Sequence, residues 1–417
     1  MSFKKLGLDD WLIQALDSLS IKAPSEIQEN CIPAILRGED VIGSAKTGSG
    51  KTAAFALPIL QKLSEDPFGV FCLVLTPTRE LAFQIAEQFR ILGSSIGLKQ
   101  SVIVGGLEMM KQAIELAQKP HIVVATPGRL ADHIQSNANA IHFKRIKYLV
   151  MDEADRLLDD SFTDNLQVIL DCLPKKRQTL LFSATMSPEI ESLEFGSKPP
   201  FVYSCATRYD TVSQLDQRYL FVPSGVRESY LVYLLLNDLT DKSIIIFAAK
   251  PRACEIIRII LREMGLRSTA LHAQMTQNER LSSLAKFKGG IVPILISTDV
   301  GSRGLDIPTV EAVVNYDLPA DATDYVHRIG RTARAGRGGM AISIVTERDI
   351  QIVLNIEEKT QKKMTELEVP EKAVLELLNQ VNLAKREAST HLLNNDFGSQ
   401  KRIQNQKSGK VFKKVKK

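Results

Sequence analysis

Short apolar runs alternate with longer amphipathic stretches along most of the chain. The runs are continuous rather than alternating, which favours strands buried on both faces, as in a parallel sheet covered by helices. In the first half they are residues 41–43, 72–75, 101–104, 122–124, 148–151 and 179–182, and in the second half 244–247, 294–296, 312–314 and 341–344. The pattern predicts an α/β protein with two tandem domains, each a mostly parallel sheet flanked by helices.

The domain boundaries follow from composition. A chain of 417 residues is long enough for two or three domains at ~150 residues each. The segment 206–213 is polar without a clear period, so we expect a linker between a domain at 1–205 and a second at 214–360. The segment 361–417 is expected to hold a charged helical extension and a disordered basic tail.

Composition excludes several classes of protein. Hydrophobic residues make up 44% and charged residues 24%, as in soluble globular proteins. No uncharged apolar run approaches the ~18 residues of a transmembrane helix, and the first residues lack the apolar core of a signal peptide. The odd number of scattered cysteines indicates a reducing compartment and argues against zinc and disulfides: Cys31, Cys72, Cys172, Cys205 and Cys254.

Positive charge is concentrated at the C-terminus. Residues 397–417 contain eight basic residues and no acidic one, so that the remaining chain, from a total of +5, carries −3. Such an arm is typical of nucleic-acid contacts or a nuclear address. A solubilising tail is the alternative, because short basic runs have low specificity.

A phosphate-binding loop is predicted after the run at 41–43. Residues 45–52 read Ala-Lys-Thr-Gly-Ser-Gly-Lys-Thr and precede an apolar helix at 53–63. Backbone N–H groups of such a loop surround phosphate oxygens, and the helix N-terminus adds its dipole. Lys51 is expected to reach the β- and γ-phosphates and the Thr52 hydroxyl to bind Mg²⁺. Ala45 departs from the general pattern, which has glycine there.

An acidic cluster, Asp152-Glu153-Ala154-Asp155, directly follows the run at 148–151. Ligands bind at the carboxyl ends of strands in open α/β sheets. Asp152 is therefore expected to hold the Mg²⁺ shell, and Glu153 to orient and deprotonate the attacking water. A solvated acidic loop is the alternative reading.

A third group of candidate residues lies at 327–334. If this stretch is helical from about Asp321, then His327, Arg331 and Arg334 share one face, with Arg328 turned roughly 100° away. Two guanidinium groups on one face can stabilise the charge on a γ-phosphate as arginine fingers. A salt-bridged surface helix is the alternative.

These residues, with others in the same order, resemble the DEAD-box RNA helicases over about residues 1–350. The further motifs are Phe3, Gln28, Pro77-Thr78-Arg79-Glu80-Leu81-Ala82, Gly105-Gly106, Thr126-Pro127-Gly128-Arg129, Ser183-Ala184-Thr185, Gln277 with Arg280, Ser297-Thr298-Asp299 and Arg303-Gly304-Leu305-Asp306. The family has alanine at position 45. The resemblance implies two RecA-like domains and the cofactors ATP and Mg²⁺.

The resemblance also assigns roles at the nucleotide. Phe3 is expected to stack on adenine and Gln28 to bind its edge, although from the residues alone both could simply pack in an N-terminal helix pair. Phosphate contacts are expected at Ala45, Thr47, Gly48, Ser49, Gly50, Lys51 and Thr52, with Asp306 contributing from the second domain. Coupling between nucleotide and RNA is expected of Asp155, Ser183, Thr185 and His327. Ser20, Ser25 and Ala273 depart from the family's usual residues.

RNA contacts are predicted at helix starts, where free N–H groups favour phosphates. The candidates are Thr78, Arg79, Gly105, Gly106, Thr126, Gly128 and Arg129 in the first domain and Gln277, Arg280, Thr298 and Arg303 in the second. Thr276 and Glu279 form a capping-box pattern, and Gln277 and Arg280 are expected on the first exposed face of that helix. Such groups address the backbone, which predicts sequence-independent binding.

The sequence thus predicts an ATP-dependent RNA helicase that couples hydrolysis to local duplex unwinding or remodelling of RNA–protein particles. Peripheral residues are most similar to the nucleolar subgroup of small-subunit ribosome biogenesis (the DEAD-box protein 8 type), which implies pre-ribosomal RNA as partner, a protein activator and a location in the nucleus and nucleolus. We expect a monomer without membrane contact. An ATP-dependent RNA clamp and a DNA helicase are the alternatives.

Overall fold

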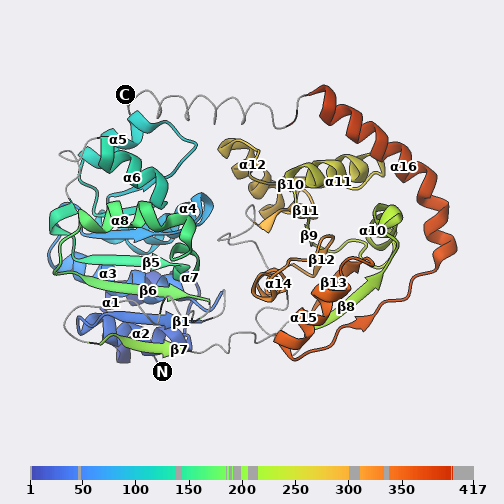
Figure 1. Ribbon diagram of the computed structural model, residues 1–417. Helices are drawn as coiled ribbons and strands as arrows, with labels where there is room; N and C mark the ends of the chain where they lie inside the picture. Colours follow the sequence, from blue (N-terminus) through green and yellow to red (C-terminus); the bar gives the residue numbers. More distant parts are fainter. Residues whose placement is uncertain are drawn as a thin grey trace. The chain divides into compact units, whose positions relative to one another are not determined.

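The computed structural model describes residues 2–45, 48–136, 143–184, 186, 190, 199–204, 215–299, 310–332, 338–395 and 397 (Figure 1). These residues fall into two compact units, the first ending at residue 204 and the second beginning at residue 215. The predicted linker at 206–213 lies outside the described residues.

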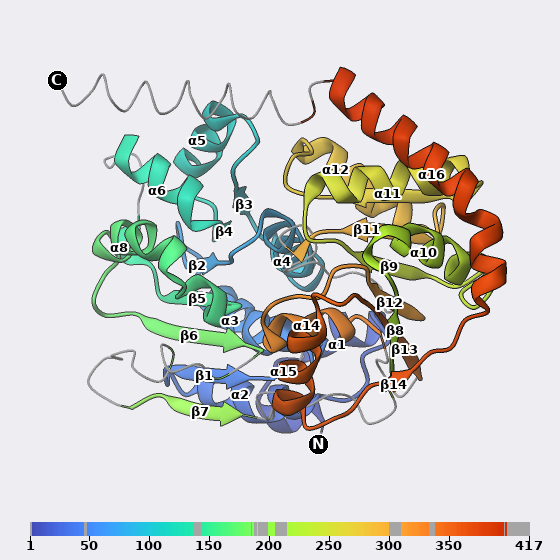
Figure 2. The same cartoon turned by 45° about the vertical axis from the view of Figure 1, so that its right-hand side comes forward.

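The first unit is built on one parallel sheet with the strand order β3-β4-β2-β5-β6-β1-β7 (Figure 2). Every pairing in it is parallel. Its strands are β1 (Val41–Ser44), β2 (Cys72–Leu75), β3 (Gln100–Ile103), β4 (Ile122–Ala125), β5 (Tyr148–Asp152), β6 (Gln178–Ser183) and β7 (Phe201–Ser204).

Helices cover both faces of this sheet because successive strand residues point to opposite faces. In β2, Cys72 and Val74 belong to one apolar cluster and Leu73 and Leu75 to another. The first cluster includes α1 (Asp10–Ser18), α2 (Glu26–Leu36), α3 (Lys51–Glu65) and α4 (Arg79–Leu92), and the second α5 (Met109–Ala117), α6 (Pro127–Ser136), α7 (Ala154–Leu157) and α8 (Thr163–Asp171). The continuous apolar strands predicted from sequence are thus buried on both sides.

The second unit repeats this topology. Its strand order is β10-β11-β9-β12-β13-β8-β14, again with parallel pairings only. Numbered from its own first strand, this order is the same as that of the first unit. The strands are β8 (Leu215–Phe221), β9 (Ile244–Phe247), β10 (Ser268–Leu271), β11 (Ile294–Ser297), β12 (Ala312–Asn315), β13 (Gly339–Val345) and β14 (Thr365–Glu366).

Helices also cover the second sheet. One face packs against α10 (Arg227–Leu236), α11 (Pro251–Glu263) and α16 (Glu371–Asn394), the other against α14 (Ala322–Ile329) and α15 (Ile350–Thr360), and α12 (Gln277–Lys288) follows β10. Short 3-10 helices are Phe3–Leu6, Ser94–Ile96, Phe143–Arg145, Asp160–Phe162 and Ser224–Val226. The predicted α/β architecture, a mostly parallel sheet flanked by helices, is confirmed for both units.

Two sequence expectations need correction. Strands β7, β8, β10 and β14 are absent from the predicted set, because β7 and β8 have alternating exposure, β10 begins with small polar residues, and β14 has two residues. The predicted helical extension is α16, which is part of the second unit: Val374, Val381, Ala384, Ala388 and Leu392 are buried.

No helix among the described residues is long and apolar enough to cross a membrane.

Candidate nucleotide and RNA sites

The nucleotide motifs of the first unit meet because their strands are neighbours. The phosphate loop follows β1, Ser183 ends β6, and Asp152 ends β5, and these strands lie side by side in the order β5-β6-β1. Ser44 is in register with Ser183, and Asp152 with Phe182. All strands are parallel, so the loop and the acidic cluster lie at the same carboxyl edge, with Ser183 between them.

The phosphate loop has the backbone geometry that its glycines permit. Gly48 and Gly50 have φ of 82° and 89°, the left-handed region that favours glycine. A Cβ on Gly50 would lie 2.3 Å from Gln28 Nε2, so there is no room for a side chain. Lys51 begins α3, and its Nζ donates to the carbonyl oxygen of Ala45 at 2.5 Å. The loop therefore closes on its own first residue; Thr47 lies outside the described residues.

Gln28 connects the N-terminal helices to this loop. Its Nε2 donates to the Gly50 carbonyl at 3.1 Å, and its Oε1 accepts from the Ser25 N–H at 3.0 Å. Phe3 is 3% exposed and packs in the same apolar cluster as α1 and α2. The structure brings Gln28 to the phosphate loop, whereas adenine stacking by Phe3 stays a prediction.

Asp152 is a buried carboxylate, 4% exposed. Burial raises its pKa to about 6, with Asp155 acting in the same direction, while Lys51 and the Glu153 N–H lower it. That N–H donates to Asp152 Oδ1 at 3.1 Å. Glu153 has φ 54°, a left-handed conformation uncommon for a residue with a side chain, at the start of α7. The turn thus places the buried Asp152 at the end of β5 and the half-buried Glu153 at the start of α7.

These residues fit a nucleotide with Mg²⁺. The described residues contain no group of three or more His, Cys, Asp or Glu side chains that could hold a metal ion. Mg²⁺ ordinarily uses one or two carboxylates together with phosphate oxygens and water. Asp152 supplies such a carboxylate, destabilised as an anion by its burial, and the half-buried Thr52 supplies a hydroxyl at the start of α3. The absence of a side chain at Gly50 lets Gln28 approach the loop backbone, and Lys51 follows at the start of α3, where N–H groups favour phosphate.

The RNA candidates of the first unit lie on the other half of the same sheet edge. Gly105 follows β3, Thr126 follows β4 and Thr78 follows β2, and these strands are neighbours in the order β3-β4-β2. Thr78 caps α4, its Oγ1 accepting from the Leu81 N–H at 3.4 Å. The topology therefore places nucleotide motifs and RNA motifs on adjacent halves of one edge.

Two arginines of this group are close together. A Cβ on Gly105 would lie 2.9 Å from Arg79 Nη2, so Gly105 allows the guanidinium to pack on the backbone. Arg129 Nη1 donates to the Leu107 carbonyl at 2.9 Å. Burial lowers the pKa of Arg129, Asp132 opposes this, and the nearby Arg79 lowers it further. Two cations beside exposed Gly106 form a candidate phosphate site.

Sequence reasoning missed the residue that braces this glycine loop. Gln112 of α5 is 4% exposed; its Oε1 accepts from the Val104 N–H at 3.1 Å, and its Nε2 donates to the Val104 carbonyl at 3.0 Å. A glutamine several residues after a Gly-Gly pair carries no motif signal, so only the structure identifies it.

In the second unit, the strands that correspond to β3-β4-β2 are β10-β11-β9. The predicted capping box is present at α12: Thr276 Oγ1 accepts from the Glu279 N–H at 3.3 Å, and Glu279 Oε2 accepts from the Thr276 N–H at 2.7 Å. Gln277 and Arg280 were expected on an exposed face, and this is wrong, since they are 4% and 8% exposed. Thr298, after β11, is 5% exposed, and Arg303 lies outside the described residues.

The arginine helix also differs from the prediction. Helix α14 ends at Ile329, with Gly330 as its C-cap, so Arg331 does not share a helical face with His327. The Arg331 carbonyl accepts from the Val310 N–H at 3.1 Å, and Thr332 forms a parallel bridge with Val310. Arg331 is thus fixed by a bridge after the helix. Its side chain is 6% exposed, and His327 is half-buried.

Arg328 has a structural role that the motif pattern does not show. It is 3% exposed and binds Asp299, with Nε–Oδ1 at 2.5 Å and Nη2–Oδ2 at 2.7 Å. Nη1 donates to the Asp317 carbonyl at 2.6 Å, and the guanidinium carbon lies 4.9 Å from the centre of the Phe247 ring. The predicted turn of Arg328 away from His327 agrees with this inward position. Thr185, Asp306 and Arg334 lie outside the described residues.

Comparison with known families agrees with this arrangement. Residues 25–193 match the model for DEAD/DEAH box helicases, and residues 227–336 match the model for the helicase conserved C-terminal domain. This chain belongs to the DEAD/DEAH box helicase family. Within that family, the chain is 53% identical to the human "Probable ATP-dependent RNA helicase DDX49", over 97% of this chain and 85% of the relative. It is 51% identical to the "ATP-dependent RNA helicase dbp8" of Schizosaccharomyces pombe, over 97% and 92%.

Solved structures resemble this DEAD-box helicase as well. Dbp5 of S. cerevisiae bound to RNA and ADP BeF3 is 31% identical, with a TM-score of 0.80 over 92% of this chain and 99% of that one. Mss116p bound to ssRNA and AMP-PNP is 28% identical, with a TM-score of 0.81 over 91% and 81%. The DEAD-box helicase described here is an ATP-dependent RNA helicase with two RecA-like units, as the sequence predicts.

Proposed function

We propose that this helicase uses each ATP to open a short RNA duplex locally or to remodel an RNA–protein particle. The observation that carries the proposal is the shared edge of the first sheet, where strands β5-β6-β1 end in nucleotide motifs and strands β3-β4-β2 end in RNA motifs. Paired strands in register connect the two groups, and this connection supports a coupling of nucleotide occupancy to RNA position.

The first unit supplies the hydrolytic groups in this proposal. Lys51 and the loop N–H groups bind phosphates, while Asp152 and Thr52 would hold Mg²⁺, which neutralises phosphate charge when bound. Glu153 orients and deprotonates the attacking water. The left-handed turn that separates it from Asp152 supports this division of roles.

The second unit supplies cationic stabilisation. We assign Arg331 and Arg334 as arginine fingers for the charge that develops on the γ-phosphate. Because base and fingers belong to different units, neither unit alone is expected to hydrolyse ATP efficiently. Asp306 contacts the nucleotide, and Ser183, Thr185, Asp155 and His327 couple it to RNA in the same proposal.

RNA is bound through its backbone. The contact residues proposed are Thr78, Arg79, Gly105, Gly106, Thr126, Gly128, Arg129, Gln277, Arg280, Thr298 and Arg303. The cations and helix starts among them suit phosphates and sugars, which supports sequence-independent binding. Gln277 and Arg280 are 4% and 8% exposed, so only a small part of each side chain is open to RNA.

A finer proposal concerns the cellular role. The similarity to helicases named dbp8 and DDX49 supports a pre-ribosomal RNA substrate, a nucleolar location and a protein activator. Among solved relatives, S. cerevisiae Dbp5 bound to Gle1 shows that a similar helicase takes a protein partner. Crosslinking in cells followed by sequencing of the attached RNA tests this; reads spread over messenger RNA without enrichment in small-subunit precursors would contradict it.

Strand displacement tests the biochemical proposal. We expect the protein to release a short RNA strand from a duplex with ATP and markedly less with a non-hydrolysable analogue. ATP hydrolysis should be stimulated by RNA and not by single-stranded DNA. Clamping of RNA without strand release in ATP would favour the RNA-clamp alternative, and stimulation by DNA would favour a DNA helicase.

A further inference from the structure

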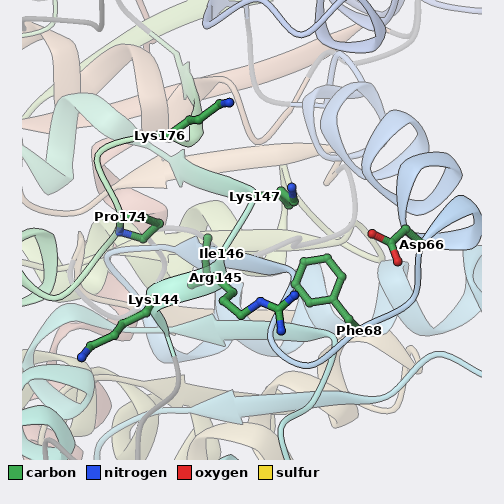
Figure 3. A pocket seen from close by; sticks show the side chains of 8 residues that line it. All are labelled: Asp66, Phe68, Lys144, Arg145, Ile146, Lys147, Pro174 and Lys176. Atoms are coloured by element: carbon green, nitrogen blue, oxygen red, sulfur yellow. The ribbon is translucent and has the colours of Figure 1, made fainter.

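A basic pocket lies in the first unit, remote from the motifs described above. It encloses about 300 Å³, and its lining includes Asp66, Phe68, Lys144, Arg145, Lys147 and Lys176 (Figure 3). Phe68 precedes β2, Lys147 immediately precedes β5, and Lys176 precedes β6. These strands are neighbours and parallel, so the pocket lies at their amino edge, whereas nucleotide and RNA motifs follow their carboxyl ends.

The pocket carries excess positive charge. Four cationic side chains line it against one carboxylate, and all four are exposed. Within the part of the chain that the structure describes, none of the four makes an ion pair or a side-chain hydrogen bond. Like charges gathered around one hollow repel each other, and an anion placed there would relieve this repulsion.

The Phe68 ring holds two of these cations in place. The Arg145 guanidinium carbon lies 5.3 Å from the ring centre and the Lys147 ammonium 6.0 Å, within the range of cation–π attraction. Figure 3 shows the Arg145 side chain running beside the ring. Phe68 itself packs edge-on against Phe71, with ring centres 5.5 Å apart.

The backbone around Lys147 is also fixed. Its N–H donates to the Phe71 carbonyl at 3.0 Å, and its carbonyl accepts from the Gln178 N–H at 2.8 Å. Lys147 is therefore tied to the strands on both sides. Because Arg145 and Lys147 cover the ring, a ligand meets positive charge rather than apolar surface.

We propose that this pocket binds backbone phosphates of RNA outside the stretch held at the carboxyl edge. Exposed, hydrated cations over a covered ring suit phosphates, whereas an acidic protein segment would gain little apolar burial there. Strands of four to six residues separate the two edges, about 13–20 Å at 3.3 Å per residue. The second contact therefore requires an RNA longer than the one that fills the helicase site. The inference rests on the RNA binding proposed above.

Binding of two RNA lengths by the full chain tests this proposal. We expect R145Q/K147Q to weaken binding of a single strand of about 40 nucleotides by about fivefold to tenfold at low salt, and to leave a strand of about 10 nucleotides unchanged. The slope of log affinity against log salt for the long strand should fall by about 1.4, as for the loss of two phosphates at 0.7 each.

Two further variants sharpen the test. K144Q/K176Q removes two pocket cations that have no ring contact, and it should give the same length-dependent loss. K22Q/K372Q removes two exposed cations elsewhere and should bind both strands as the natural protein does. Unchanged ATPase stimulation by the short strand in each variant shows that the helicase site is intact; its loss would point to a failure of the RNA site itself.

Two outcomes would overturn the proposal. Equal affinities and salt slopes of R145Q/K147Q, K144Q/K176Q and the natural protein for the long strand would exclude RNA from the pocket. Loss of binding to poly-glutamate in the pocket variants, with RNA binding retained, would instead assign the pocket to an acidic protein segment.

Discussion

Arg328 and Asp299 form a two-point ion pair in the second unit, with Nε–Oδ1 at 2.5 Å and Nη2–Oδ2 at 2.7 Å. The pair joins α14 to the residues after β11, two elements whose motifs are assigned to different ligands. The Arg328 nitrogens Nε, Nη1 and Nη2 all donate hydrogen bonds within the unit, so its charge can meet a ligand only with loss of these bonds. Arg328, in the last turn of α14, therefore stabilises the contact between this helix and the segment after β11.

Arg328→Ala should destabilise the second unit strongly. Removal of Arg328 takes this two-point counter-charge away from a partly buried Asp299. Loss of one partner of a buried pair typically costs 3–5 kcal/mol, so we expect a loss of about 3 kcal/mol in the free energy of unfolding. Arg328→Lys should restore little, because an ammonium cannot reproduce the two-point geometry. Urea unfolding followed by circular dichroism measures this. Arg262→Ala, in an exposed pair with Glu263, is the control and should change stability by less than about 1 kcal/mol.

Arg331→Ala should slow ATP hydrolysis by about 10³-fold or more, as for loss of an arginine finger, and change RNA affinity far less. Its backbone bridge to Val310 does not depend on the side chain, so this bridge should persist in the variant. Single-turnover hydrolysis and fluorescence anisotropy separate the two effects. Equal losses in both would argue against a finger.

Glu153→Gln should keep ATP and RNA binding and reduce turnover by about 10²–10⁴-fold, the usual contribution of a general base. Glutamine has the same size and adopts the φ of 54° no less readily than glutamate, so the turn should be unchanged. We expect RNA to remain trapped in ATP, measurable as slow release in a competition assay. A variant with normal turnover would remove Glu153 from the role of base.

Asp152→Asn should stabilise the first unit in the absence of nucleotide and Mg²⁺. The pKa of Asp152 is raised to about 6 by burial, so the folded state binds its proton more tightly than the unfolded state. The charged form is therefore a cost at pH 7.5, of the order of 2–3 kcal/mol at 1.36 kcal/mol per pKa unit, and asparagine removes it.

The gain in the free energy of unfolding from Asp152→Asn should shrink as the pH falls through about 6. It should vanish below about 4, where Asp152 is protonated in both the folded and the unfolded state. Thermal unfolding of the variant and the natural protein at several pH values measures the difference. Asp17→Asn, at an exposed position of α1, should show no such dependence. A stability gain that stayed constant from pH 4 to 8 would contradict the prediction that the buried Asp152 carboxylate destabilises the folded state.

Removal of residues 398–417 should weaken RNA binding and make its salt dependence shallower, because eight basic residues are lost. The deletion should begin after Phe397, whose ring lies 5.9 Å edge-on from the His272 ring and packs with Ile259 and Leu392. An intact unfolding transition with an unchanged salt slope would make the tail a targeting or solubility element.

Much of this protein could be predicted from sequence because the signals are local. Continuous apolar runs predicted ten strands within one or two residues, and Gly-Ser-Gly-Lys-Thr predicted the loop at the start of α3. A turn of glycines and a helix N-terminus depend on neighbouring residues alone. The capping box at Thr276 and Glu279 was correct for the same reason.

The failures concern contacts between distant residues. The shared helical face predicted for His327 and Arg331 assumed a continuous helix, but α14 ends before Gly330. The backbone of Arg331 and Thr332 is instead fixed by Val310, which is distant in sequence. Exposure of Gln277 and Arg280 was misjudged because burial depends on neighbours that helical periodicity cannot identify. The edge strand β14 has only two residues, and β7 is a short Phe-Val-Tyr-Ser run that is only partly buried; both are defined by their pairing with a neighbouring strand.

The sequence by itself therefore determined the elements, the phosphate loop and the chemical types at each site. Only the tertiary structure decided the strand order, and with it the placement of Asp152, Ser183 and the loop at one half-edge and of Thr78, Gly105 and Thr126 at the other. It also decided that Arg328 serves the fold and that cations gather at the opposite edge of the first sheet. Strand order depends on long-range pairing free energies, which no local pattern of residues encodes.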